Sequence, residues 1–162
     1  MASASPVCLG FVTVVQEPLG YVGGLLVTNP WGRPLEFRLS SPVQPNRVQQ
    51  ILYGPALERY VCADVIGKAL IEKTSSVMQA LVSDRVELLE ARCHVKAPLV
   101  CLCDGAAEEH TAWRAHPQHP QDAEAVRALL RDSTLDLAEP FVRIREALAE
   151  ARKLGLTRPQ AA

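Results

Sequence analysis

The sequence predicts an α/β (α+β) domain: an antiparallel three-stranded meander, then a long helix, two or three further strands and C-terminal helices. The stretch 9–41 carries most of this prediction, because it holds three apolar segments separated by turns at 17–20 and 29–32. Each turn has proline at its second position, where φ of about −65° is already required, and glycine at its fourth. Apolar runs joined by such turns fold back as neighbouring strands.

Within this meander, the three segments differ in pattern. Apolar and polar residues alternate over 35–40, which is typical of a half-buried strand. The segment 21–28 is apolar on both faces and contains Gly23 and Gly24. Adjacent glycines in a strand indicate a bulge or a close backbone approach. A ligand admitted by the missing side chains is the alternative, and packing is the favoured interpretation.

Helices are expected after the meander. Asn46 can cap a short helix with apolar residues on one face, until Gly54-Pro55 interrupts it. A longer helix is predicted over 56–73. In its second half, Asp64 belongs to a charged stripe at i, i+4 spacing, which we interpret as a solvated face.

The first half of the helix 56–73 is apolar on a different side. Leu57, Tyr60 and Val61 form this side. One small sheet face does not account for so much apolar helix surface. We therefore expect the helix to be covered additionally, by the C-terminal helices or by a second subunit.

The segment 85–95 decides the architecture, because strands are expected before it at 77–82 and after it at 99–103. The alternation of Val86 and Leu88 favours a strand, although helical spacing also gives an apolar face. With a helix here, the order resembles the ribonuclease H-like topology: an antiparallel meander, a crossover helix and two parallel strands separated by a helix. With a strand, it resembles profilin-like, longin and roadblock domains. Either resemblance rests on element order over 9–103 and implies no activity.

The C-terminal part is predicted to be helical. Residues 105–122 lack periodicity and are expected to form an exposed loop or linker, followed by a short helix over 123–131. A last helix begins near Glu139-Pro140. Its narrow apolar seam is expected to pack on the chain's own sheet, with docking to a partner helix as the alternative. The predicted organisation is a core domain over 1–104, a linker over 105–122 and helices over 123–158.

Composition narrows the class of protein. The 162 residues allow one domain, and the net charge of −1 gives no general attraction to nucleic acid. No apolar run reaches the roughly 18 residues of a membrane helix, and residues 1–6 lack the pattern of a secretory signal. We therefore expect a cytoplasmic protein without a membrane partner. The excess of arginine over lysine, with abundant alanine, is typical of a GC-rich bacterial genome.

The five cysteines are expected to be reduced thiols, because their number is odd and no export signal is visible. A zinc site is the alternative. Cys101 and Cys103 would share a strand face, and His116 and His119 follow at i, i+3. The chain lacks a Cys-x-x-Cys pair, so buried thiols and loop histidines are the favoured interpretation and no cofactor is predicted.

A ribonuclease H-like enzyme would hold two divalent metal ions with carboxylates, one of them in the first strand. The segment 9–16 contains no acid. Asp84 ends the fourth strand, and Glu58 or Asp64 could reach it from the helix. We interpret them as turn and surface residues, and treat a metal-dependent nuclease or nucleic-acid-binding domain as the alternative function.

The favoured function is a non-enzymatic, cytoplasmic protein-binding or accessory subunit that can self-associate as a homodimer. This hypothesis rests on the missing catalytic constellation and on the surplus of apolar helix surface. A zinc-binding structural module is a further alternative. The predicted interface residues are Leu57, Tyr60, Val61, Phe141, Ile144 and Leu148.

Overall fold

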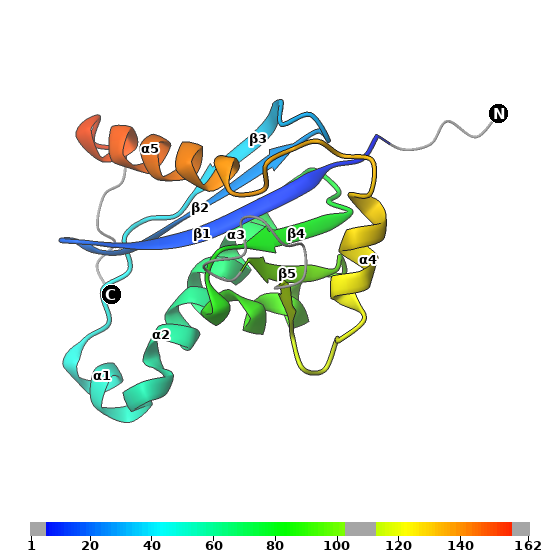
Figure 1. Ribbon diagram of the computed structural model, residues 1–162. Coiled ribbons are helices and arrows are strands. Elements are labelled where there is room, and N and C mark those ends of the chain that lie inside the picture. The colour runs from blue at the N-terminus through cyan, green and yellow to red at the C-terminus, as the bar shows by residue number, and fades with distance from the viewer. Residues whose placement is uncertain (1–5, 103–112, 157–162) are drawn as a thin grey trace.

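A mixed sheet with helices on both faces forms the protein (Figure 1). The computed structural model describes residues 6–102 and 113–156. Within them the strand order is β3-β2-β1-β4-β5-β6. β1 is antiparallel to β2 and parallel to β4, and β5 is parallel to β4 and antiparallel to β6. The strands are β1 (Leu9–Glu17), β2 (Gly20–Thr28), β3 (Pro34–Leu39), β4 (Ala80–Ser83), β5 (Leu99–Leu102) and β6 (Trp113–Ala115). The α/β class and the opening meander are confirmed.

The two predicted turns join the strands of the meander. In the second turn the Gly32 N–H donates to the Asn29 carbonyl at 3.0 Å. Gly20 and Gly32 have φ of 126° and 85°, which only glycine adopts without strain. The turn glycines are therefore required by the backbone itself.

Gly23 and Gly24 allow helices to approach β2 from its two faces. A Cβ at Gly24 would lie 2.6 Å from the Cγ2 of Ile144, and a Cβ at Gly23 would collide with Ile66. The close-approach interpretation is confirmed. The irregular register of the meander lies elsewhere, between Val27 and Thr28.

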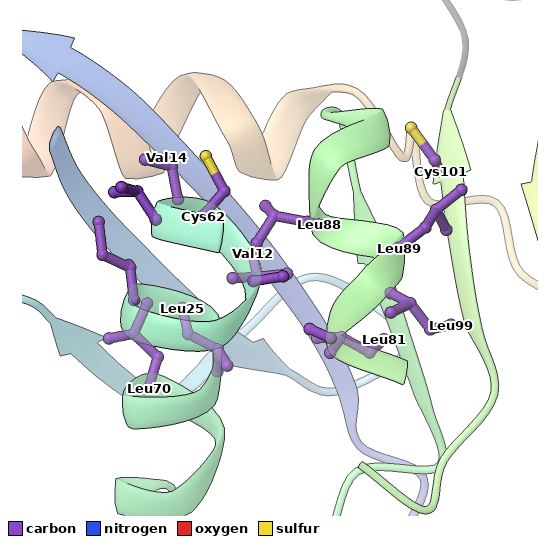
Figure 2. Close-up of a cluster of buried hydrophobic side chains, with 14 of the residues drawn as sticks. Val12, Val14, Leu25, Cys62, Leu70, Leu81, Leu88, Leu89, Leu99 and Cys101 are labelled. Carbon is purple, nitrogen blue, oxygen red and sulfur yellow. The ribbon is translucent and has the colours of Figure 1, made fainter. Parts of the chain in front are cut away.

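The first helical layer begins after Asn46. It consists of α1 (Arg47–Tyr53), η1 (Gly54–Ala56), α2 (Leu57–Arg59), η2 (Tyr60–Gly67) and α3 (Lys68–Lys73). The expected helix 56–73 is thus a continuous helical segment, but its middle part is a π-helix. Cys62 and Leu70 from this course pack with Val12, Val14 and Leu25 of the sheet (Figure 2).

The segment 85–95 is helical, so the strand interpretation is wrong. It forms the 3-10 helix η3 (Val86–His94), in which the consecutive residues Leu88 and Leu89 are both buried. A strand would turn these neighbours to opposite faces, but η3 packs both into the cluster of Figure 2. The element order is therefore that of the helical alternative: a meander, a crossover helix and two parallel strands separated by a helix.

The second helical layer consists of α4 (Asp122–Leu129) and α5 (Glu139–Lys153). The seam of α5 packs on the sheet, where the ring of Phe141 meets the ring of Phe11 edge-on at 5.7 Å. Ile144 and Leu148 are also buried in this cluster. The expectation that α5 covers its own sheet is confirmed.

Two further findings concern the region after β5. Trp113 to Ala115 form β6, a strand that the sequence pattern did not predict. Asp122 does not act as an N-cap, since its carboxylate lies in the first turn and accepts from Arg92 Nε at 2.6 Å and from the Leu99 N–H. Among the described residues, no helix has the length and apolar composition needed to cross a bilayer.

Candidate functional site

Helix α1 exposes its apolar face. Val48, Ile51 and Leu52 are 63%, 64% and 76% exposed, and α1 has no buried residue. Figure 1 shows α1 at the end of an arm that extends away from the sheet. A continuous apolar face in solvent is the typical mark of an interaction surface. We call these three residues the α1 ridge.

The helix is held by local hydrogen bonds and not by burial. The Asn46 side chain accepts from the Gln49 N–H at 2.9 Å, and the Gln49 side chain accepts from the Asn46 N–H at 3.0 Å. This reciprocal capping box satisfies two donors at the helix start. At the other end, Gly54 has φ of 51° and its N–H bonds to the Gln50 carbonyl. The sequence thus encodes both ends of a helix that contributes nothing to the core.

An aromatic stack connects the end of α1 to the layer below. The rings of Tyr53 and Tyr60 lie 4.2 Å apart at an interplanar angle of 15°. Tyr60 begins the π-helical segment, and Leu57 is half-buried beside it. Val61 is buried, so of the predicted interface residues only Leu57 and Tyr60 retain surface near the ridge.

The remaining predicted interface residues lie inside the chain. Phe141, Ile144 and Leu148 are at most 2% exposed beneath α5. Their side chains are therefore not accessible to a partner in this structure.

A polar hollow of about 390 Å³ lies between the tip of the β1–β2 hairpin and α1. Gln16, Glu17, Gln44 and Gln50 contribute amide and carboxylate groups to its wall. Tyr21 also lines it, and burial, followed by the nearby Glu58 carboxylate, raises the pKa of this phenol. The hollow therefore offers hydrogen-bonding groups beside α1, on the side of Gln50 and away from the ridge, because residues two apart on a helix do not share a face.

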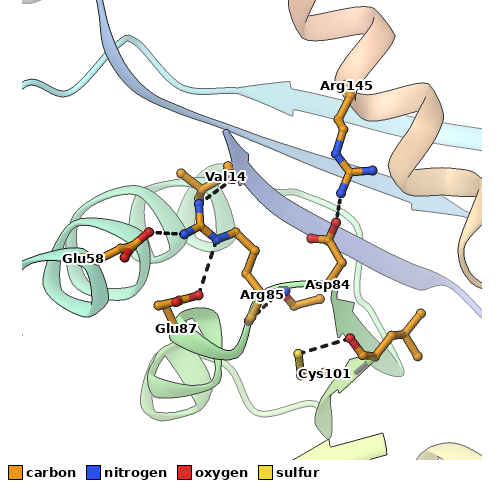
Figure 3. Close-up of polar contacts among 9 residues, drawn as sticks. Val14, Glu58, Asp84, Arg85, Glu87, Cys101 and Arg145 are labelled. Atoms are coloured by element: carbon orange, nitrogen blue, oxygen red, sulfur yellow. Dashed lines mark hydrogen bonds and ion pairs between the residues drawn. The ribbon is translucent and has the colours of Figure 1, made fainter. Parts of the chain in front are cut away.

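The carboxyl end of β4, beside the middle of β1, carries the second candidate site (Figure 3). Asp84 follows β4, and its Oδ2 pairs with Arg145 of α5. Two buried side-chain oxygens, Asp84 Oδ1 and Thr13 Oγ1, have no hydrogen-bond partner among the described residues. Since Val12 faces Ser83 in the parallel register, Thr13 and Asp84 are neighbours on the sheet. Open α/β sheets bind their ligands outside the carboxyl ends of their strands, which is where Asp84 lies.

Arg85 is turned away from Asp84, toward the other layer. Its guanidinium donates to the Val14 carbonyl at 2.9 Å and pairs with Glu58 of α2 and Glu87 of η3. Figure 3 shows that these contacts of Arg85 connect β1 to α2 and η3. Glu58, a predicted carboxylate candidate, is therefore a partner of Arg85.

The three predicted carboxylates do not converge. Asp84 pairs with α5 on one face of the sheet, whereas Glu58 lies in the layer on the other face. Asp64 is exposed and contacts His94 at 3.2 Å. Two-metal chemistry requires several oxygens around ions about 4 Å apart. This arrangement of Asp84, Glu58 and Asp64 does not provide it.

The predicted zinc ligands are also dispersed. Cys101 is buried under η3, and Cys103 lies outside the described residues. The rings of His116 and His119 are 6.0 Å apart, and His116 contacts Glu90 at 3.3 Å. Over 6–102 and 113–156 there is no group of three or more histidine, cysteine or acidic residues placed to hold a metal ion.

The buried thiol of Cys62, whose pKa the Arg85 charge affects, is not activated. Burial raises the pKa of Cys62 to about 11, and the opposing effect of Arg85 is smaller. Glu58 and Glu87 raise it further. Since the thiolate is the reactive form, Cys62 stays an unreactive thiol at neutral pH.

Comparisons with protein-family models, curated proteins and solved structures found no match for this chain. The likeness in element order to ribonuclease H-like proteins therefore stands on topology alone, and topology assigns no activity.

Sequence reasoning missed two features of these sites. It identified the apolar face of α1 but did not predict that this face would remain exposed. The available signal is that α1 lies between the proline-rich linker 41–45 and Gly54-Pro55, which separate it from its neighbours. It gave no role to Thr13 or Arg85. Their roles depend on strand pairing and helix placement, which single residues do not reveal.

Proposed function

We propose that this chain is a non-enzymatic, cytoplasmic protein that works by binding another protein through the α1 ridge. The observation that carries the proposal is the capped helix whose Val48, Ile51 and Leu52 face solvent. These residues occupy positions i, i+3 and i+4, the spacing with which a helix enters an apolar groove of a partner. The expected partner therefore presents such a groove.

The surroundings of the ridge suit a specific contact. Arg47 is exposed one helical turn before Ile51 and can bind polar groups at the rim of the partner's groove. An apolar centre with a polar rim is the usual anatomy of a protein interface. The capping box of Asn46 preforms the helix, which lowers the entropy lost on binding.

The test begins with a photo-crosslinking amino acid at position 47 of the tagged chain in its native host. Arg47 is exposed, lies one helical turn before Ile51 and belongs neither to the ridge nor to the capping box. The protein that is cross-linked reproducibly is then purified, and its affinity is measured by calorimetry. The variant Ile51→Ser/Leu52→Ser should weaken binding by roughly 30-fold or more, the effect of losing a hot spot.

The matched control is Val77→Ser. Val77 is 78% exposed but lies outside α1, so its loss should leave the affinity unchanged. Hydrogen exchange of the α1 amides should slow in the complex. Equal binding by the ridge variant and the wild type, or unchanged exchange in α1, would refute the proposal.

A second candidate function follows from Asp84. Among the residues that the structure describes, Thr13 Oγ1 and Asp84 Oδ1 lack hydrogen-bond partners. Asp84 follows the carboxyl end of the central strand β4, where a nucleic-acid-processing domain of ribonuclease H-like topology would act. Metal-dependent cleavage of nucleic acid that Asp84→Asn abolishes would support it. Against it stand the pairing of Asp84 with Arg145 and the composition of β1, whose one acid, Glu17, is the last residue of the strand and not central in it.

A further inference from the structure

Within residues 6–102 and 113–156, strand β3 leaves one side of its backbone unpaired. It ends the sheet, with β2 as its sole neighbour in the strand order. The Ser40 N–H bonds to the Gly23 carbonyl at 2.9 Å, and the register places Arg38 opposite Leu25 and Glu36 opposite Val27. Because hydrogen-bonded pairs alternate along an antiparallel ladder, the backbone groups of Glu36 and Arg38 point toward β2.

Phe37 and Leu39 therefore point their N–H and C=O groups outward. Leu35 is the extra residue of β3 at the register shift, where Glu36 faces Val27 but Pro34 faces Thr28. Leu35 and Phe37 are also 49% and 37% exposed. Natural sheets usually protect an open edge with lysine, proline or a covering segment. Pro34 and the register shift protect the start of β3. The run 36–39 contains neither lysine nor proline, so its backbone is suited to pairing with another strand.

The sequence of β3 is complementary to itself in the antiparallel direction. With a two-fold axis at Phe37, Phe37 faces Phe37 of a second copy. Leu35 then faces Leu39, and Glu36 faces Arg38, on both sides of the axis. We infer that β3 pairs with β3 of a second copy of this chain, which joins the two sheets into one. Isologous contacts of this kind are the commonest in homo-oligomers.

Charge fixes the register of this pairing. A slip of two residues, which keeps the faces of the sheet, places either Glu36 opposite Glu36 or Arg38 opposite Arg38. Like charges directly opposite each other destabilise a strand pair, whereas opposite charges stabilise it. The register centred on Phe37 is therefore favoured over both of its neighbours.

The existing contacts of these residues agree with the pairing. Arg38 Nε lies 2.9 Å from Glu36 Oε2 in the same chain, and the Arg38 side chain is still 44% exposed. Glu36 is fixed by Ser75 and Ser76. The carboxylate is thus anchored on its own subunit, and the guanidinium retains surface for the second copy. This interface is separate from the α1 ridge.

The first test is the oligomeric state of the full chain, measured by sedimentation equilibrium. The wild type should be a dimer. Arg38→Glu places two acids opposite each other at both ends of the pairing, and should raise the dimer dissociation constant about tenfold or more. Arg59 of α2 is also exposed, so Arg59→Glu makes the same change of charge away from β3 and should leave the dimer dissociation constant unaltered.

The second test locates the axis and does not depend on Arg38. Facing Cα atoms of a hydrogen-bonded pair lie about 5.5 Å apart, within the range for a disulfide. In a Cys93→Ser background, Phe37→Cys should form a disulfide-linked dimer on mild oxidation. Leu35→Cys should not, because the two copies of residue 35 would be roughly 13 Å apart.

Three results would overturn the inference. One is a wild-type monomer at every concentration. Another is equal cross-linking of Phe37→Cys and Leu35→Cys. The third is a dimer that Ile51→Ser/Leu52→Ser dissociates while Arg38→Glu does not. The last result would place self-association on α1, whereas loss of partner binding alone leaves the β3 dimer intact, so the two proposals fail separately.

Discussion

Two leucines on two amphipathic helices should respond very differently to truncation. Leu52 of α1 is 76% exposed, whereas Leu148 of α5 is 1% exposed. Burying a whole leucine side chain contributes about 1.5–3 kcal/mol, so the quarter of Leu52 that is covered accounts for roughly 0.4–0.7 kcal/mol. Alanine is the better helix former, which recovers about 0.2 kcal/mol. We therefore expect Leu52→Ala to lower the free energy of unfolding by about 0.5 kcal/mol or less.

Leu148→Ala removes the same atoms from the core. It also leaves a cavity between α5 and the sheet, so the expected loss is about 2–5 kcal/mol. Urea denaturation followed by circular dichroism, at one protein concentration for all variants, measures both. The midpoint should shift strongly for Leu148→Ala alone, at unchanged slope. A loss above about 1.5 kcal/mol for Leu52→Ala would show that α1 is packed in the free protein, and would refute the exposed ridge.

Two further charge contacts, one half-buried and one buried, give predictions. Burial tends to raise the pKa of Glu36, but hydrogen bonds from Arg38, Ser75 and Ser76 outweigh it and lower the pKa to about 2. The folded pKa thus lies below the usual 4.5, so the ionised carboxylate stabilises the fold. Near pH 7 the free energy of unfolding of the wild type should exceed that of Glu36→Gln by about 1–3 kcal/mol. Urea titrations should show this difference shrinking as the pH falls from 4.5 toward 2. The Asp122 carboxylate is 3% exposed against the Arg92 guanidinium, so Arg92→Ala should cost about 3–5 kcal/mol and the addition of Asp122→Asn should recover part of it; an unchanged midpoint for Arg92→Ala would contradict this.

The meander was predictable because its signals are local. Turns with Pro18 and Gly20, or Pro30 and Gly32, need no tertiary contact to specify a reversal. The capping of α1 by Asn46 was predictable for the same reason. By contrast, the sequence only favoured a strand over a helix for the segment of η3 and did not decide between them, because the alternation of a short run cannot be distinguished from a helix buried on one side. The short β6 depends on pairing with β5 and has too few residues to show a period.

The sites were predictable only in part. The i, i+3, i+4 spacing of the ridge is visible in the sequence, but whether such a face is covered depends on where the chain takes the helix. The seam of α5 has similar spacing and is buried. Asp84 was located at the end of β4, yet its pairing with Arg145 joins residues that are distant in sequence. Periodicity therefore identifies apolar faces, and the packing of the layers decides which face remains free.

The two proposed surfaces would act together. A β3 dimer carries two α1 ridges, and the two-fold axis fixes the distance between them. A partner that is itself dimeric, or that is arrayed on a surface, would then bind the second ridge as an intramolecular step at a high effective concentration. Each ridge is small, with three apolar anchors, so a single contact is expected to be weak. In a monomer made by Arg38→Glu the ridge is intact, so binding to one isolated groove should persist, whereas binding to an arrayed partner should fall. This combination would attribute affinity to α1 and avidity to β3.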